Sequence, residues 1–321
     1  MSVNNFPNLV EALLAAPSRK PFVTMWHDED DVHTVSFGQF VELAKSHAAQ
    51  FQQQGLRVGD RVILIMPQGI PLMAAFAGAM LLGAVPAILA YPNFKADPVK
   101  YSHGLAGVSE NLRAQLVIVD QGFPPELLSY LTLAGGSRIF RSRLLNESCG
   151  ASLPEFRPES DAMAFIQHSA GTTGLQKGVA LSHRAVLTQL DHLAEALSLS
   201  DQDRIYSWLP LYHDMGLIAC FMLPLVYHLP VVMQSPIDWV VRPGTMLQLI
   251  SDCGCTLAWV PNFALQFLAR RVPPDGRGAY NLSTLRALIN CSEPVRAQSM
   301  DEFSGAYRRC GLSGEALKSS Y

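Results

Sequence analysis

The sequence has few charged residues and no cluster of basic ones. Charged side chains make up 16% of the 321 residues, and 24 Lys and Arg against 27 Asp and Glu give a formal net charge of −3. A nucleic-acid surface needs clustered Lys and Arg, and a disordered tail or a coiled coil carries more charge than this. We therefore expect a globular protein without a nucleic-acid partner.

Cysteines and targeting signals are also scarce. Only Cys253 and Cys255 lie close together among six cysteines, which makes neither a disulfide framework nor a zinc pattern. The first twenty residues place no basic group ahead of their apolar stretch, unlike a signal peptide. These features predict free thiols in a reducing compartment and a cytoplasmic location.

One uncharged run is long enough to cross a membrane. It covers residues 69–92, GIPLMAAFAGAMLLGAVPAILAYP. Its three prolines, Pro71, Pro86 and Pro92, and the lack of a clustered basic flank favour a buried helix followed by a buried strand. We therefore expect no transmembrane segment.

Apolar strands alternate with helices along the chain. A hairpin is expected around the acidic turn at 28–31 and an amphipathic helix over 37–55, followed by apolar strands at 60–66, 85–89 and 115–120. After residue 158 the rhythm resumes with strands near 162–169, 204–210, 256–260 and 287–292 and a helix over 184–199. The pattern predicts an α/β fold of two αβ lobes with mostly parallel sheets covered by helices. The polar stretch 134–158 predicts a boundary between lobes 1–158 and 159–321.

The strongest chemical pattern is SAGTTGLQKG at residues 169–178, directly after an expected strand. Glycines let backbone N–H groups approach an anion, hydroxyls add donors, and Lys177 adds positive charge. The pattern indicates a grip for polyphosphate, with a plain surface turn as the alternative. It is not a Walker A loop, because Gly178 follows Lys177 where Ser or Thr is required.

This segment resembles the phosphate loop of the adenylate-forming (acyl-activating, AMP-binding) superfamily, S-G-T-T-G-x-P-K-G-V. Ala170 is an extra small residue here, and Gln176 replaces the usual proline. Two later segments also resemble family motifs: WLPLYHDMGL at 208–217 is similar to P-x-x-H-x-x-G, and NCSEPV at 290–295 to G-[AS]-E-P. PNFA at 261–264 suits the fatty-acyl branch. The chain looks like the N-terminal portion of a fatty-acyl-AMP ligase or fatty acyl-CoA synthetase.

The resemblance implies ATP-dependent activation of a fatty acid to an acyl-adenylate, with release of pyrophosphate and a requirement for Mg²⁺. The acyl group would then pass to an acyl carrier protein or to CoA. Lys177, His213 and Thr173 would be catalytic, with His213 at the acyl-carboxylate end and the protein acting by positioning and charge neutralisation. The residues implied to bind the nucleotide are Ser169, Gly171, Thr172, Thr173, Gly174, Lys177, Gly178, Ser292, Glu293, Pro294 and Tyr321.

Tyr321 falls where the next family motif begins. The resemblance places a magnesium-binding glutamate, a ribose-binding aspartate, a hinge and a small C-terminal domain beyond it, so no metal ligand is expected among these residues. The implied reading is a fragment that is inactive alone. A non-catalytic remnant that binds nucleotide or acyl groups is the alternative. An unrelated NTPase or kinase is disfavoured, because the Walker A serine and the kinase segments are missing.

Other polar patterns have structural as well as functional interpretations. His213 with Asp214 fits a general-base pair, half a metal site, or a loop histidine that positions substrate. The polar turn at 27–33 has metal-ligand residue types, although hairpin turns are polar anyway. Cys291 beside Ser292 is better explained as a buried small residue than as a nucleophile. The apolar stripe 221–232 is expected to be core, with an acyl pocket as the other interpretation.

Overall fold

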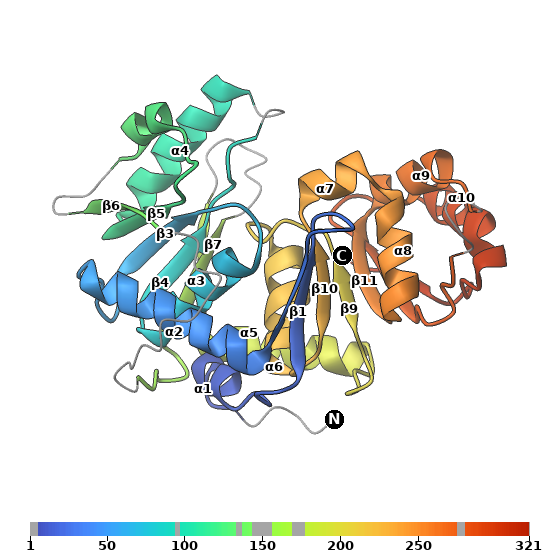
Figure 1. The fold of residues 1–321 in the computed structure, drawn as a ribbon, viewed down its shortest axis with the longest axis horizontal. Coiled ribbons are helices and arrows are strands. Elements are labelled where there is room, and N and C mark those ends of the chain that lie inside the picture. Colours follow the sequence, from blue (N-terminus) through green and yellow to red (C-terminus); the bar gives the residue numbers. More distant parts are fainter. Residues whose placement is uncertain are drawn as a thin grey trace.

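Three β-sheets organise the chain (Figure 1). The computed structural model describes residues 6–93, 97–132, 137–142, 156–168, 177–274 and 280–320. The largest sheet has seven strands in the order β13-β12-β11-β9-β10-β1-β2. All its neighbours pair in parallel except β1 and β2. Its strands are β1 (Pro21–Trp26), β2 (Val32–Ser36), β9 (Ile205–Ser207), β10 (Val231–Gln234), β11 (Leu257–Pro261), β12 (Ala287–Cys291) and β13 (Leu317–Ser319).

The second sheet is wholly parallel and the third is a two-stranded hairpin. The second has the order β4-β3-β5-β6, with β3 (Arg61–Ile65), β4 (Val85–Ile88), β5 (Leu116–Val119) and β6 (Arg138–Arg141). The third pairs β7 (Met163–His168) with β8 (Gly178–Ser182) in antiparallel fashion, and β7 packs against β4. The predicted α/β fold with mostly parallel sheets is therefore confirmed.

Helices cover the faces of both large sheets (Figure 1). They are α1 (Leu9–Leu14), α2 (Phe37–Gln53), α3 (Ile70–Leu81), α4 (Pro98–Leu112), α5 (His183–Ala196), α6 (Leu223–Val226), α7 (Pro236–Val241), α8 (Gly244–Cys253), α9 (Asn262–Arg271) and α10 (Ala297–Tyr307). Shorter helical segments are η1 (Pro125–Tyr130), η2 (Met215–Met222, a π-helix) and η3 (Arg308–Cys310). Among the described residues, no helix is long and apolar enough to cross a membrane. The uncharged run at 69–92 instead contains α3 and β4, both buried.

The N-terminal hairpin belongs to the sheet of the second half of the chain. β1 and β2 pair around the acidic turn as predicted, but β1 then runs parallel to β10, with Val23 opposite Val231. Strand pairing therefore crosses the expected boundary at residue 158. Whether the chain folds as two units that meet at this residue stays a prediction.

Some strands were not indicated by the sequence, β6 and β8 among them. β6 lies inside the polar stretch 134–158, which was expected to be irregular, and β8 lies between the glycine loop and α5. Both are short edge elements whose polar or exposed side chains give no apolar alternation. They form because a neighbouring strand, β5 or β7, offers a ladder of backbone hydrogen bonds.

The contact between α2 and α3 is tight and contains a buried histidine. A Cβ on Gly78 of α3 would lie 2.5 Å from the carbonyl oxygen of Ala44 in α2, so only glycine fits there. His47 of α2 lies at this contact with no exposed surface. Within the described structure neither of its ring nitrogens has a hydrogen-bond partner. Burial lowers the pKa of His47 to about 4, so the ring is neutral in the folded protein.

We expect His47 to make the protein sensitive to acid. The unfolded chain binds a proton near pH 6.5, whereas folded His47 resists protonation until about pH 4. The free energy of unfolding therefore falls as pH drops through this window, by roughly 3 kcal/mol from this residue alone. Urea unfolding at several pH values should show a shallower loss for His47→Leu. His192→Leu, at an exposed position of α5, is the control. Parallel curves for His47→Leu and the unsubstituted protein would contradict the assignment.

Candidate functional site

The carboxyl ends of three neighbouring parallel strands carry two of the three sequence motifs. β9 runs beside β11, and β11 runs beside β12. The segment 208–214 follows β9, α9 follows β11, and the segment 292–296 follows β12. Parallel strands end at one edge of their sheet, and open α/β sheets bind ligands outside that edge. The structure therefore brings the motifs at 208–217 and 290–295 together.

The effect of Asp214 on Cys291 agrees with the neighbouring positions of the two motifs. Burial raises the pKa of the Cys291 thiol, and the negative charge of Asp214 adds to this effect. Cys291 ends β12 and directly precedes Ser292, whereas Asp214 directly follows His213. The loop of His213 and the segment that begins at Ser292 thus lie at one place on the sheet edge.

His213 begins the helical turn that leads into η2. Its backbone N–H donates to the carbonyl of Pro210 (3.1 Å), and its own carbonyl accepts from the N–H of Leu217 (2.9 Å). Burial lowers the pKa of the half-buried imidazole, although Asp214 opposes this shift. Asp214 accepts from the N–H of Met215 (2.8 Å) and caps η2. In the described structure no hydrogen bond joins the two side chains, so the geometry favours a neutral positioning histidine over a general-base pair.

Gly216 allows η2 to pack directly on the preceding loop. A Cβ at this position would lie 2.3 Å from the carbonyl oxygen of Pro210, far inside van der Waals contact. π-helical turns such as η2 are rare and are often found at functional sites. The glycine of the HDMGL motif therefore has a steric reason, which the spacing of the motif alone did not reveal.

Glu293 has a structural partner. One of its carboxylate oxygens accepts from the backbone N–H of Phe263 (2.6 Å), the second residue of α9. This places a negative charge at the helix N-terminus, where it is favourable. Ser292, before it, has a left-handed backbone with φ of 71°, and Pro294, after it, is exposed. The segment is a strained turn fastened to α9 by Glu293.

Asn262 connects three elements beneath this turn and was missed as a site residue. Its side-chain oxygen accepts from the Nδ2 of Asn290 and from the backbone N–H of Arg296, both at 3.0 Å. Its own Nδ2 donates to Ser299 (3.1 Å). The residue is buried, so these bonds are shielded from water. The polar residue in the otherwise apolar PNFA segment was the available signal.

An aromatic cluster borders the same edge. The rings of Trp208 and Trp239 stack at 3.9 Å with an angle of 4°, and Phe263 lies edge-on to both at 6.3 and 6.1 Å. Phe263 is 50% exposed, whereas both indole N–H groups are buried without a partner among the described residues.

The apolar stripe 221–232 was expected to be core, with an acyl pocket as the other interpretation. Nearly all of its side chains are buried in the main core, as expected.

The phosphate-loop motif is held at its two ends by a hairpin. His168 pairs with Gly178 in the β7–β8 ladder, and Lys177 precedes Gly178 with an exposed side chain. The other predicted nucleotide-binding residues of the loop lie outside the described structure, as does Tyr321, so their roles stay predictions. They are Ser169, Gly171, Thr172, Thr173 and Gly174.

The competing candidate sites find little support. His27 contacts Asp238 (3.1 Å) and His33 contacts Asp31 (2.8 Å). No group of three metal-ligating side chains occurs within the ranges that the structure describes. Burial is the main cause of the raised pKa of Cys291, and a thiol is a poor nucleophile unless it ionises. The explanations as a polar turn and a buried small residue are therefore favoured.

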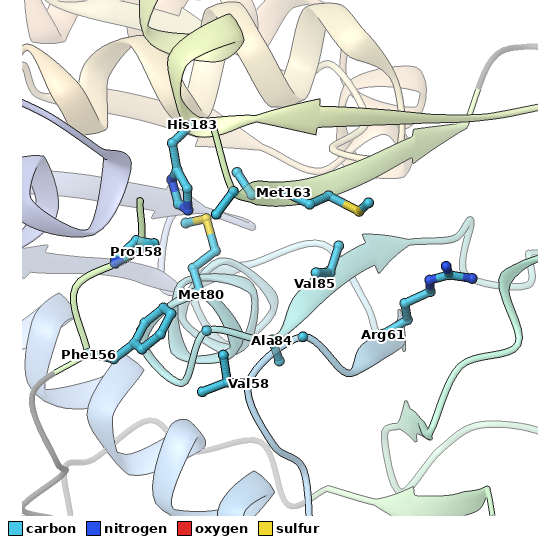
Figure 2. Close-up of a pocket in the computed structure, with 13 residues that line it drawn as sticks. Val58, Arg61, Met80, Ala84, Val85, Phe156, Pro158, Met163 and His183 are labelled. Atoms are coloured by element: carbon cyan, nitrogen blue, oxygen red, sulfur yellow. The ribbon is translucent and has the colours of Figure 1, made fainter. Parts of the chain in front are cut away.

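A separate pocket lies beside the four-stranded sheet, at the amino ends of β3 and β4 (Figure 2). It encloses about 270 Å³ and is lined by Met80, Phe156, Pro158 and other mostly apolar residues. Arg61 begins β3 and Val85 begins β4, so the pocket faces the amino ends of these strands. It is distinct from the sheet edge where the motifs at 208–217 and 290–295 meet.

We expect Asn262→Ala to loosen the segment 292–296. The change removes three hydrogen bonds and leaves buried groups of Asn290 and Ser299 without this partner, which should cost on the order of 3 kcal/mol of unfolding free energy. Chemical denaturation provides the measurement. Asn281→Ala, which removes an exposed cap on Ser283, is the control and should cost about 1 kcal/mol or less. Equal losses of unfolding free energy in the two variants would show that the buried network around Asn262 does not stabilise the protein more than the exposed cap does.

Comparison with known proteins agrees with this geometry. The family model for AMP-binding enzymes matches residues 11–314. A medium-chain-fatty-acid–[acyl-carrier-protein] ligase of Moorena producens is 27% identical, over all of this chain and 55% of its own length. A long-chain-fatty-acid–AMP ligase of Mycolicibacterium smegmatis is 31% identical, over 89% of this chain and 46% of its own length. The chain spans about half the length of these relatives.

Solved structures show the same likeness. The fatty acyl-adenylate ligase of Legionella pneumophila, crystallised with acyl adenylate and pyrophosphate, superimposes with a TM-score of 0.85. It is 26% identical, and the match covers 98% of this chain and 54% of that protein. The two motifs at the strand ends, the match over residues 11–314 and this structural likeness lead to one conclusion. The chain belongs to the family of AMP-binding enzymes and is similar to the fatty-acyl-AMP ligases.

Proposed function

We propose that this chain forms the part of a fatty-acyl-AMP ligase that binds the fatty acid and ATP. An oxygen of the fatty-acid carboxylate forms a bond to the α-phosphorus of ATP. The bond from that phosphorus to the oxygen bridging to the β-phosphorus breaks, and pyrophosphate leaves with the electron pair. The observation that carries the proposal is the meeting of the His213 loop and the segment 292–294 at one sheet edge, in a fold shared with a ligase crystallised with acyl adenylate and pyrophosphate.

The loop at 169–178 would hold the leaving phosphates. We assign Thr172, Thr173 and Lys177 to the β- and γ-phosphates, with the glycines of the loop shaping the backbone around them. Pairing of His168 with Gly178 fixes both ends of the loop, which supports this role. A lysine at one end brings a positive charge to the departing anion.

His213 would orient the acyl carboxylate. A lowered pKa keeps the ring neutral near pH 7, so a ring nitrogen can donate one hydrogen bond to the carboxylate without forming a competing ion pair. Ser292, Glu293 and Pro294 would lie beside the adenine. Because Glu293 is already bonded to the N–H of Phe263, we assign it the task of shaping that wall rather than proton transfer. Tyr321 is proposed to extend the adenine site.

The acceptor and the metal are further parts of the proposal. We infer an acyl carrier protein or CoA as acceptor, and the motifs at 208–217, 261–264 and 290–295 favour the branch that uses a carrier protein. Mg²⁺ is proposed to accompany ATP. The described residues contain no group of three metal-ligating side chains, so no residue of this chain is assigned to the ion. We further propose that the protein acts in the cytoplasm.

The test of the proposed function is exchange of radiolabelled pyrophosphate into ATP. In a protein of the relatives' length that contains this chain, exchange should depend on added fatty acid. The 321-residue chain alone should show none, because it spans about half of its relatives. Fatty-acid-independent exchange, or none in the longer protein, would overturn the proposed activity. Binding of fatty acid and ATP without exchange in the longer protein would support the non-catalytic alternative.

We expect Lys177→Ala to weaken ATP binding by about tenfold or more, because it removes a positive charge from the phosphates. Calorimetric titration of ATP into the chain measures this directly. Lys100→Ala, at an exposed position of α4, is the control and should leave the affinity unchanged. Equal ATP affinities for Lys177→Ala and the unsubstituted chain would remove Lys177 from the phosphate site.

A further inference from the structure

Gln68 connects the four-stranded sheet to the seven-stranded sheet at their carboxyl ends. It lies in the loop between β3 and α3. Its side-chain Nε2 donates to the carbonyl oxygens of Leu209 and Gln234, both at 3.2 Å. Its Oε1 accepts from the backbone N–H of Leu211 (3.1 Å). One side chain therefore uses three of its four hydrogen-bonding positions on backbone groups more than 140 residues away.

Two of these bonds lie on either side of Pro210, in the loop that carries His213. The carbonyl of Pro210 accepts from the N–H of His213, and the same oxygen lies where a Cβ on Gly216 would collide. The backbone from Leu209 to Leu211 is thus the platform on which the first turn of η2 rests. Gln68, from the loop between β3 and α3, holds this backbone through its bonds to Leu209 and Leu211.

The third bond ties the loop to the neighbouring strand. Gln234 ends β10, is fully buried, and accepts from the hydroxyl of Tyr206 through its side chain. Because Gln68 bonds to the Gln234 carbonyl as well as to Leu209, it bridges the carboxyl ends of β9 and β10. A bridge of this kind leaves the loop little freedom to change its height above the sheet.

We propose that Gln68 is a positioning residue, which fixes the loop 208–214 and through it the orientation of the His213 imidazole. The inference rests on the proposed function only for the chemical task of His213. The side chain of Gln68, which follows a strand of the four-stranded sheet, fixes the geometry of a loop at the edge of the seven-stranded sheet. Gln68 touches neither substrate nor reacting atoms in this account.

Gln68→Met tests the claim by keeping the length of the side chain and removing all three hydrogen bonds. In the 321-residue chain, the Leu211 amide should exchange with solvent about tenfold faster. NMR titration should show the pKa of His213 moving up toward its ordinary value, because a loosened ring reaches water. Tyr212, whose ring lies 4.8 Å away, and Asp214 are the neighbouring titratable groups, and neither changes in this variant.

Two further variants separate positioning from general loss of stability. Gln121→Met removes an amide that bonds the carbonyls of Arg141 (3.0 Å) and Ser142 (3.5 Å) rather than the loop 208–214, and should alter neither readout. Gln68→Glu keeps an acceptor for the Leu211 N–H, so exchange of that amide should stay closer to its original rate than in Gln68→Met. This second variant also keeps the test available if Gln68→Met does not fold.

The outcomes are decisive in both directions. Unchanged Leu211 exchange and His213 titration in Gln68→Met, an equal change in Gln121→Met, or a uniform rise in exchange along the chain would each overturn the proposal. Titration of a non-hydrolysable acyl-sulfamoyl adenosine keeps the two claims apart. If the unsubstituted chain does not bind this analogue, the proposed function fails, while the loop result stands on its own.

Discussion

Parallel pairing of β9, β11 and β12 is the constraint on which the site depends. The motif residues 208–217 and 290–295 are some eighty positions apart in sequence, and nothing local draws them together. Because the three strands run in the same direction and lie side by side, everything that follows them emerges at one edge. The buried strands supply the apolar driving force for this arrangement, and the loops inherit their positions from it.

The two loops at that edge, 208–214 and 292–296, are each bonded by a polar side chain from another element. Gln68 reaches the His213 loop from the other sheet. Asn262 reaches the segment 292–296 from the start of α9. These side chains hold irregular backbone against rigid helices and strands, and the proposed function requires this because it depends on positioning the substrates. Glu293 also fixes this turn, because its carboxylate accepts a hydrogen bond from the first turn of α9.

Much of the fold was predictable because its signals are local. The hairpin around residues 28–31, the helix starting at Phe37 and the apolar strands β3, β4 and β5 follow from alternation, capping and hydrophobic runs. The placement of β1 beside β10 could not be predicted, because strand partners some two hundred residues apart leave no trace in periodicity. Similarly, His213 stood out through its motif, whereas Gln68 acts through three backbone contacts that exist only in the folded chain.

The most direct test of this account is amide hydrogen exchange of the chain with and without a non-hydrolysable acyl-adenylate analogue. Binding at the carboxyl ends of the strands predicts slower exchange in the segments 208–217 and 290–296, with no change around the pocket between Arg61 and His183 (Figure 2). Protection at that pocket, or none in either segment, would contradict the central claim that this sheet edge holds the acyl-adenylate.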